Sequence, residues 1–223
     1  MFVKICGTTS EEDAILAVAM GADALGFIFA PSSRQVAPRL VAEIVRRLPP
    51  EILTVGVFRD EAPSRVVEVV HACGLRGAQL SGHETAEQSR WVRERLPFTI
   101  KAFAAGDRAL ADAADYGADV VMLDAASPGS GKIFDWSLAS QVPPGLRLLL
   151  AGGLHADNVA DAIDAVHPWG VDAVTGVERE PGKKDPRRLR MFVAAAKAAG
   201  ESDEGPDDEN GDLPFDWQEE ELT

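Results

Sequence analysis

Eight short apolar runs, each followed by a segment with helical periodicity, divide the first 200 residues of this 223-residue chain. The runs are rich in Val, Ile, Leu and Phe and show no clean polar alternation, which is typical of strands buried on both faces of a parallel sheet. They cover residues 2–6, 24–29, 52–58, 77–80, 98–103, 119–124, 146–152 and 171–176.

The segments between these runs carry the boundary signals of helices. They cover residues 10–21, 38–48, 63–74, 84–96, 107–117, 135–141, 156–168 and 185–200. The first begins with a Ser cap and an acidic turn, and the last has Pro near its start and Gly at its end. Eight strand–helix units in about 200 residues predict an α/β fold, the (β/α)8 TIM barrel. A doubly wound open sheet is the alternative, but it usually has fewer strands and a G-x-G-x-x-G turn after the first one.

Residues 201–223 differ in composition from the rest of the chain. They hold 11 acidic residues and no Lys or Arg, whereas the whole chain has 36 acidic and 22 basic residues. Residues 1–200 are therefore predicted to form a single barrel domain, and residues 201–223 an acidic tail that is disordered. The nearly balanced body lacks the clustered Lys and Arg of a nucleic-acid surface.

The composition also indicates where the protein is located and which partners it can bind. No apolar run reaches the roughly 18 residues of a membrane span, and the start lacks the basic and apolar segments of a secretory signal. We therefore expect a cytoplasmic protein that binds neither membranes nor nucleic acid. Its two cysteines and four histidines show no metal-ligand spacing, so no metal is expected. A monomer and a homodimer both remain open.

Two ionisable residues stand where predicted strands end. In a barrel, the carboxyl ends of all strands open onto one face, where catalysis takes place. The first strand ends on Cys6 and the sixth on Asp124, which fit a base and an acid, and Arg34 lies in the loop after the second strand. A thiol at this face is expected to ionise more readily than its reference pKa of about 8.5 indicates. Cys73 lies in a predicted helix and is interpreted as structural.

Glycine-rich turns follow the seventh and eighth strands, which are neighbours in a barrel. The first turn is "AGGL", with Gly152 and Gly153, and the second is "TGVE", with Thr175 and Gly176. Glycine lets backbone N–H groups approach an anion closely, and the helix N-termini that follow add positive partial charge. The ends of these two strands are the usual phosphate position of such barrels, so the pattern predicts a phosphate site, with simple turns as the alternative.

Several stretches together resemble one enzyme family, phosphoribosylanthranilate isomerase of tryptophan biosynthesis. They are "VKICGTT", "ADALGFIFAPSSRQVAP", "VGVF", "AQLSGHE", "LLLAGGLHADNV" and "VDAVTGVEREPGKKD", and the resemblance covers about residues 2–199. It implies a (β/α)8 barrel that uses no cofactor and no metal. The implied reaction is an Amadori rearrangement of N-(5-phosphoribosyl)anthranilate, a small-molecule phosphoribosyl substrate, into the 1-deoxyribulose aminoketose.

The resemblance also implies a role for each matching residue. Cys6 would be the general base, Asp124 the general acid, and Arg34 the group that holds the anthranilate moiety. The residues implied to lie against the phosphate or the rest of the substrate are Gly152, Gly153, Asp172, Thr175 and Gly176.

Several positions depart from the family pattern, and Val174 and Thr175 stand where the family usually has two serines. Ser81 replaces a substrate-side histidine, with His83 two residues later, and Pro128 replaces the first glycine of the loop after the sixth strand. The first alternative function is a related barrel isomerase acting on another phosphoribosyl aminoaldose by two aspartates, against which Cys6 argues. The second is a non-catalytic sugar-phosphate-binding barrel, against which Cys6 and Asp124 together argue.

Overall fold

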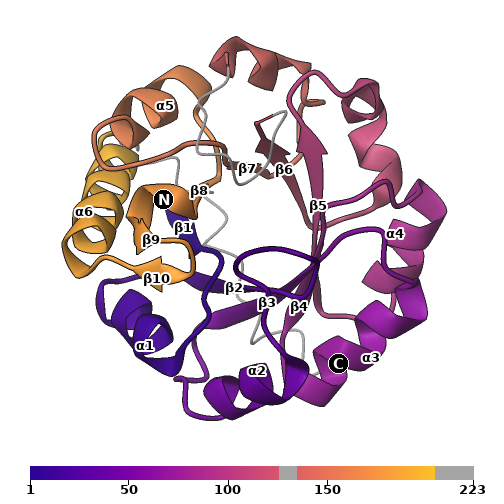
Figure 1. The fold of residues 1–223 in the computed structure, drawn as a ribbon. Helices are drawn as coiled ribbons and strands as arrows, with labels where there is room; N and C mark the ends of the chain where they lie inside the picture. The colour runs from indigo at the N-terminus through magenta and orange to yellow at the C-terminus, as the bar shows by residue number, and fades with distance from the viewer. Residues whose placement is uncertain (126–134, 204–223) are drawn as a thin grey trace.

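The computed structural model describes residues 1–125 and 135–203, in which eight parallel strands close into a barrel. The strands follow one another around the barrel in chain order, and β8 closes it by pairing with β1 (Figure 1). They are β1 Phe2–Ile5, β2 Ala24–Ile28, β3 Leu53–Phe58, β4 Gly77–Leu80, β5 Phe98–Ala104, β6 Val120–Asp124, β7 Leu148–Leu150 and β8 Gly170–Ala173. The (β/α)8 TIM barrel predicted from the eight apolar runs is confirmed.

Helices form a ring outside the sheet. The α-helices are α1 Glu11–Ala19, α2 Pro38–Val45, α3 Pro63–Cys73, α4 Ala86–Arg93, α5 Val159–Val166 and α6 Pro186–Asp203. Two segments predicted as helices form 3-10 helices instead, η1 Arg108–Tyr116 and η2 Trp136–Gln141, and η1 is interrupted by a non-helical residue at Asp112. Among the described helices none is long and apolar enough to cross a membrane.

The last helix runs past the predicted domain boundary. α6 continues to Asp203, whereas the boundary was predicted at residue 200. The rest of the predicted acidic tail and Pro128 lie outside the described residues.

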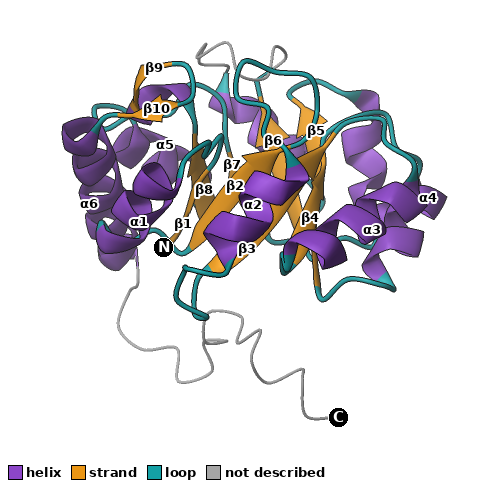
Figure 2. Cartoon of the chain, turned by 60° about the horizontal axis from the view of Figure 1, so that its bottom comes forward, coloured by secondary structure: helices purple, strands orange, loops and turns teal. Residues whose placement is uncertain are grey.

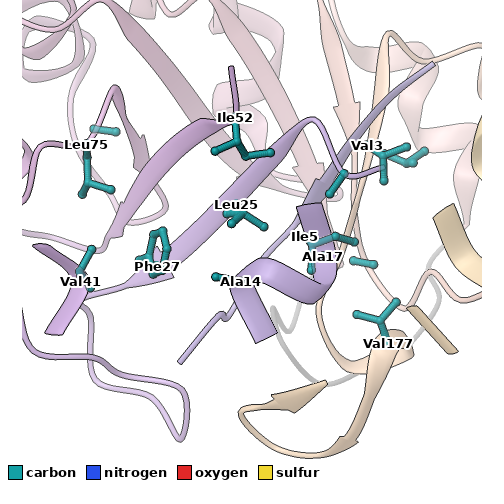
Figure 3. Packing of buried hydrophobic residues seen from close by; sticks show 14 of the residues in the cluster. Val3, Ile5, Ala14, Ala17, Leu25, Phe27, Val41, Ile52, Leu75 and Val177 are labelled. Atoms are coloured by element: carbon teal, nitrogen blue, oxygen red, sulfur yellow. The ribbon is translucent and has the colours of Figure 1, made fainter. Parts of the chain in front are cut away.

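Side chains along each strand alternate between the helix ring and the barrel interior. Val3 and Ile5 of β1 and Leu25 and Phe27 of β2 face outward, and Figure 3 shows them with α1 and its neighbours. The inward positions form a separate apolar layer, whose buried members are Ala24, Leu53, Val55, Phe98, Ile100, Val120, Met122, Leu149 and Ala151. Because successive side chains point to opposite faces, polar residues at the remaining inward positions must lie inside the barrel.

A two-stranded hairpin, which the apolar pattern did not predict, covers part of the rim. It follows the short 3-10 helix η3 Thr175–Val177 and consists of β9 Glu178–Glu180 and β10 Lys183–Lys184, paired antiparallel. Figure 2 shows it at the end of the barrel where the strands finish, above α1 and α6. The hairpin therefore contributes side chains to the face predicted to carry the site.

Candidate active site

The predicted base lies directly after the first strand. Cys6 is 4% exposed, and its N–H donates to the Ala173 carbonyl on β8 at 2.9 Å, which holds it against the closing strand. A Cβ atom at Gly26 on β2 would lie 2.5 Å from Cys6 Sγ. Glycine at position 26 is therefore what makes room for the thiol on the interior side of the neighbouring strand.

The predicted acid is the last residue of β6. Asp124 follows Val120 and Met122 at alternate positions, so its side chain continues their inward-facing row. One carboxylate oxygen accepts the N–H of Ala125 at 2.7 Å. The structure thus places Cys6 and Asp124 at the same end of the barrel interior.

A buried ion pair lies in the same interior. Lys4 and Asp172 are register partners on β1 and β8, and Lys4 Nζ lies 2.7 Å from Asp172 Oδ1. Lys4 is completely buried and Asp172 nearly so. Asp172, predicted to lie near the substrate, therefore has a partner within the protein that the sequence did not reveal.

These charges shift the pKa of Asp124 in the direction that a general acid needs. Burial, which disfavours the ionised form, and then the negative charge of Asp172 raise the pKa of Asp124 to about 6. The Ala125 hydrogen bond and the cations Lys4 and Arg59 act in the opposite sense and are outweighed. Part of the Asp124 population therefore stays protonated close to neutral pH.

The Cys6 thiol behaves differently from the expectation. Its pKa is raised, not lowered, because burial of the thiolate outweighs the attraction of Lys4 and Lys184, and Asp172 adds repulsion. The expectation that this thiol ionises readily was wrong, because the thiol lies at the end of a strand but is buried. Lys4 and Lys184 oppose this rise in pKa.

Arg34, in the loop after β2, lies against Gly7, the residue after the predicted base, and is held by a carboxylate. Its Nε donates to Glu178 Oε1 at 2.9 Å and its Nη2 to Oε2 at 2.7 Å, and both side chains are buried. Gly7 has a φ of 71°, and a Cβ there would lie 2.7 Å from Arg34 Cδ. The residue after the predicted base must therefore be glycine for the arginine to reach this position.

Glu178 also binds a second buried cation, Lys184 of the hairpin. Lys184 Nζ lies 3.2 Å from Glu178 Oε1 and donates to the Cys6 carbonyl at 2.6 Å. The N–H of Gly182 donates to the same Oε1 at 3.2 Å. One carboxylate thus connects the hairpin, Arg34 and the backbone of Cys6.

The two glycine-rich turns predicted to bind phosphate touch each other. Gly152 and Gly153 adopt φ angles of 90° and 68°, which favour glycine. In the second turn, which starts at Thr175, a Cβ at Gly176 would lie 2.0 Å from the Leu154 carbonyl oxygen. The turns after β7 and β8 can approach this closely only because position 176 has no side chain.

Asn158, just before α5, shapes the first of these turns. Its Oδ1 accepts the N–H of His155 at 2.8 Å, and its Nδ2 donates to the Gly153 carbonyl at 3.1 Å. Its amide therefore closes the turn on itself.

The substituted position after β4 has a new partner. Ser81 Oγ accepts from Gln79 Nε2 at 3.0 Å. His83 does not take the place of the missing histidine, because it is exposed and faces Asp60, with 3.2 Å between Nδ1 and Oδ1. The Oε1 of Gln79 is buried and has no hydrogen-bond partner among the described residues.

The prediction from sequence missed Lys4, Glu178, Lys184, Asn158 and Gln79. The signal for Lys4 was a lysine in an otherwise apolar strand, and Glu178 and Lys184 stand in the quoted stretch "GVEREPGKKD". Within residues 1–125 and 135–203, no group of three or more His, Cys, Asp or Glu side chains is arranged to hold a metal ion.

Comparison with known proteins identifies the family. The sequence model described as N-(5'phosphoribosyl)anthranilate (PRA) isomerase matches residues 3–195. The N-(5'-phosphoribosyl)anthranilate isomerase of Desulforudis audaxviator is 47% identical over 204 residues, which cover 88% of this chain and 98% of the relative.

Solved structures agree with this assignment. Phosphoribosyl anthranilate isomerase from Thermus thermophilus has a TM-score of 0.84 at 38% identity, covering 89% of this chain and 99% of its own. A phosphoribosyl anthranilate isomerase in complex with reduced 1-(o-carboxyphenylamino)-1-deoxyribulose 5-phosphate has a TM-score of 0.79 at 39% identity, with the same coverage of both chains. The chain with the barrel, the interior thiol and the interior carboxyl group described above belongs to the N-(5'-phosphoribosyl)anthranilate isomerase family.

Proposed function

We propose that this protein is an isomerase of tryptophan biosynthesis that converts N-(5-phosphoribosyl)anthranilate into 1-(2-carboxyphenylamino)-1-deoxyribulose 5-phosphate. The observation that carries the proposal is the presence of Cys6 and Asp124 at one end of the barrel interior, with the pKa of Asp124 raised to about 6. A carboxyl group that is partly protonated near neutral pH can donate a proton, which an ordinary aspartate cannot. The reaction, an aldose–ketose isomerisation, needs one such donor and one base.

The first step in the proposal is ring opening. Protonated Asp124 donates its proton to the ribose ring oxygen, the bond from that oxygen to C1′ breaks, and a protonated Schiff base forms between C1′ and the anilino nitrogen. Asp124 is then a carboxylate, for which the Ala125 N–H already supplies a hydrogen bond at 2.7 Å.

The second step is proton abstraction from C2′. The Cys6 thiolate removes this proton, and the C2′–H electron pair forms the C1′–C2′ double bond of an enolamine. Tautomerisation to the ketone adds a proton at C1′ and removes one from the C2′ hydroxyl. The Cys6 thiol holds one proton and the Asp124 carboxylate accepts another, so the two groups return together to their starting states.

Binding in the proposal uses groups around this pair. Arg34 has five N–H donors, and Glu178 occupies the Nε and one from Nη2. The remaining donors would hold the anthranilate carboxylate. Gly152, Gly153, Thr175 and Gly176 are proposed to hold the phosphate through backbone N–H groups.

The proposal extends to the organisation of the protein. We propose a cytoplasmic enzyme in which residues 1–200 are the catalytic domain and residues 201–223 are not needed for catalysis. A related phosphoribosylanthranilate isomerase from Thermotoga maritima is dimeric. We infer that this chain works as a monomer or a homodimer.

The direct test is a product assay. N-(5-phosphoribosyl)anthranilate is generated in place from anthranilate and phosphoribosyl pyrophosphate by a phosphoribosyltransferase, and the ketone carbon of the product is followed by carbon NMR. We expect the ketone signal only with the intact chain and not with Cys6→Ser. No ketone with the intact chain, together with failure to restore growth of an isomerase-deficient tryptophan auxotroph, would reject the proposal.

A further inference from the structure

Lys4 is a buried cation that has no role in the proposed acid–base steps. It is 0% exposed, and its ammonium lies 2.7 Å from Asp172 Oδ1 on the adjacent strand. Lysine is rarely buried completely, and a buried charge is costly unless it is paired. An apolar residue could fill this inward position in the barrel, so the lysine calls for an explanation.

The second neighbour of this ammonium is the thiol. Lys4 and Cys6 are two residues apart on the same strand, so their side chains stand on the same face of β1. The positive charge of Lys4 lowers the pKa of the Cys6 thiol, and it does so more strongly than the charge of Lys184. One buried cation therefore pairs with a carboxylate and acts electrostatically on the thiol of the proposed base.

We propose that Lys4 is the positioning residue that stabilises Cys6 as a thiolate, and that Asp172 sets the strength of this effect by sharing the same ammonium. The proposal rests on the proposed function only in treating Cys6 as the base. Lys4 stays protonated throughout and transfers no proton to the substrate.

Other charged groups surround Cys6, and their partners are different. From the hairpin, Lys184 donates to Glu178 and to the Cys6 backbone carbonyl. From the loop after β2, Arg34 is held by Glu178. Asp172 on β8 and Asp124 on β6 are acidic and disfavour a thiolate, so among the described residues Lys4 is the cation whose charge most strongly favours the Cys6 thiolate.

The same pair also acts on the acid. Asp172 raises the pKa of Asp124, whereas Lys4 lowers it. During the proposed reaction, negative charge leaves Cys6 and appears on Asp124. Lys4 and Asp172 act electrostatically on both Cys6 and Asp124. The buried pair therefore offsets part of the change in charge at each of these two residues.

The test measures the thiol directly in the absence of substrate. The chain has two cysteines, so a Cys73→Ala background leaves Cys6 as the source of the thiolate ultraviolet absorbance. In this background, Lys4→Met is expected to raise the pKa of the Cys6 thiol by about one to three pH units, because a nearby opposite charge is lost. Asp172→Asn is expected to lower the pKa of this thiol, because a nearby negative charge is lost and the Lys4 ammonium no longer pairs with a carboxylate.

A matched control and a second variant keep the test decisive. Lys101 is also buried and pairs with Glu84 at 2.7 Å, but it lies on β5 and faces the helix ring. Lys101→Met should leave the thiol pKa unchanged. Because Lys4→Met leaves Asp172 unpaired, the double variant Lys4→Met with Asp172→Asn removes both charges. Its thiol pKa should lie above that of Asp172→Asn alone.

The kinetic expectation is a fall in kcat of up to about 10- to 1000-fold in Lys4→Met, matching the lost fraction of thiolate, with KM unchanged. An unchanged thiol pKa on removal of Lys4, in both the Asp172 and the Asp172→Asn backgrounds, would overturn the proposal. Since the titration needs no substrate, a chain that shows the thiol shift but makes no ketone would reject the proposed function and leave this inference intact.

Discussion

Glu178 and Arg34 form a two-point contact across the rim of the barrel, with Nε–Oε1 at 2.9 Å and Nη2–Oε2 at 2.7 Å. The arginine comes from the loop after β2 and the glutamate from the hairpin after β8. A guanidinium held at two points cannot rotate freely, so its remaining donors keep a fixed direction. The contact therefore fixes the orientation of the group proposed to hold the anthranilate carboxylate.

Replacement of this carboxylate should weaken substrate binding more than it slows chemistry. We expect Glu178→Gln to raise KM by about tenfold, because an amide keeps the size but loses the charged hydrogen bonds. It should also lower the free energy of unfolding by about 3 kcal/mol, since Arg34 and Lys184 lose a buried partner. Steady-state kinetics and urea unfolding measure the two effects.

A second glutamate of the same hairpin provides the control. Glu180 is exposed and pairs with Lys183 at 2.6 Å. Glu180→Gln should change neither KM nor stability measurably. If Glu178→Gln also leaves KM unchanged, Glu178 does not orient the substrate-binding arginine.

Cys6→Ser should retain the fold and lose activity by about 10²- to 10⁴-fold, because a serine hydroxyl at this position is a far weaker base than a thiolate. Cys73, on α3, is the matched site, and Cys73→Ser should retain full turnover. Circular dichroism verifies the fold of both variants. Turnover close to that of the unmodified enzyme in Cys6→Ser would remove Cys6 from the mechanism.

Asp124→Asn should lose activity and gain stability. The ordinary pKa of Asp is 3.8, and burial and Asp172 raise that of Asp124 to about 6, so ionisation of this group opposes folding increasingly between these two pH values and fully above them. Below about pH 4 the two proteins should be equally stable. The variant should become more stable as pH rises from 4 to 6, by about 3 kcal/mol at neutral pH.

Urea unfolding at several pH values gives this curve, and Asp119→Asn serves as a comparison at a carboxylate outside the proposed catalytic pair. A stability difference that does not change between acid and neutral pH would show that the pKa of Asp124 is not raised.

Gly176→Ala should impair phosphate binding. Its new Cβ would lie 2.0 Å from the Leu154 carbonyl, so the turns after β7 and β8 must move apart. Inhibition by inorganic phosphate should weaken about tenfold or more, with a parallel rise in KM. Gly74→Ala adds the same atom at a helix end with a φ of 68° and should cost stability without changing phosphate inhibition. Equal phosphate inhibition in both variants would argue against a phosphate site at this turn.

A chain ending at Asp203 should keep the activity and the melting temperature of the full chain. The described barrel closes with β8 and is covered by α6, which ends at this residue. The remaining residues are strongly acidic and too poor in apolar surface to offset the entropy lost on ordering. A fall of several degrees in melting temperature would show that these residues stabilise the body.

The strands were predictable because burial on both faces leaves a continuous apolar run, and all eight were found at the expected places. The hairpin β9–β10 was not predictable in this way, since its residues are charged and it is held by ion pairs. Segments 107–117 and 135–141 carry helical composition but are too short or interrupted to complete regular α-helices.

The site residues likewise divide into those that the sequence predicts and those that it does not. The strand-end positions of Cys6 and Asp124 follow from the order of elements alone. The partners Lys4 and Asp172 are 168 residues apart, and Arg34 and Glu178 are 144 apart. Such pairs become visible only when the register of β1 against β8 and the path of the hairpin are known. The depth of burial that raises the pKa of Cys6 is likewise a property of the closed barrel.

The seam between β1 and β8 makes the proposed site depend on residues that are synthesised long after Cys6. Cys6 leaves the ribosome early, but its backbone partner Ala173, the ion pair that involves Asp172, and Lys184 all come from the other end. Before those residues are in place, the burial and the neighbouring charges that shift the pKa of the Cys6 thiol are incomplete. A barrel that lacks β8 is therefore expected to lack the proposed site, and activity would then report that the barrel is closed.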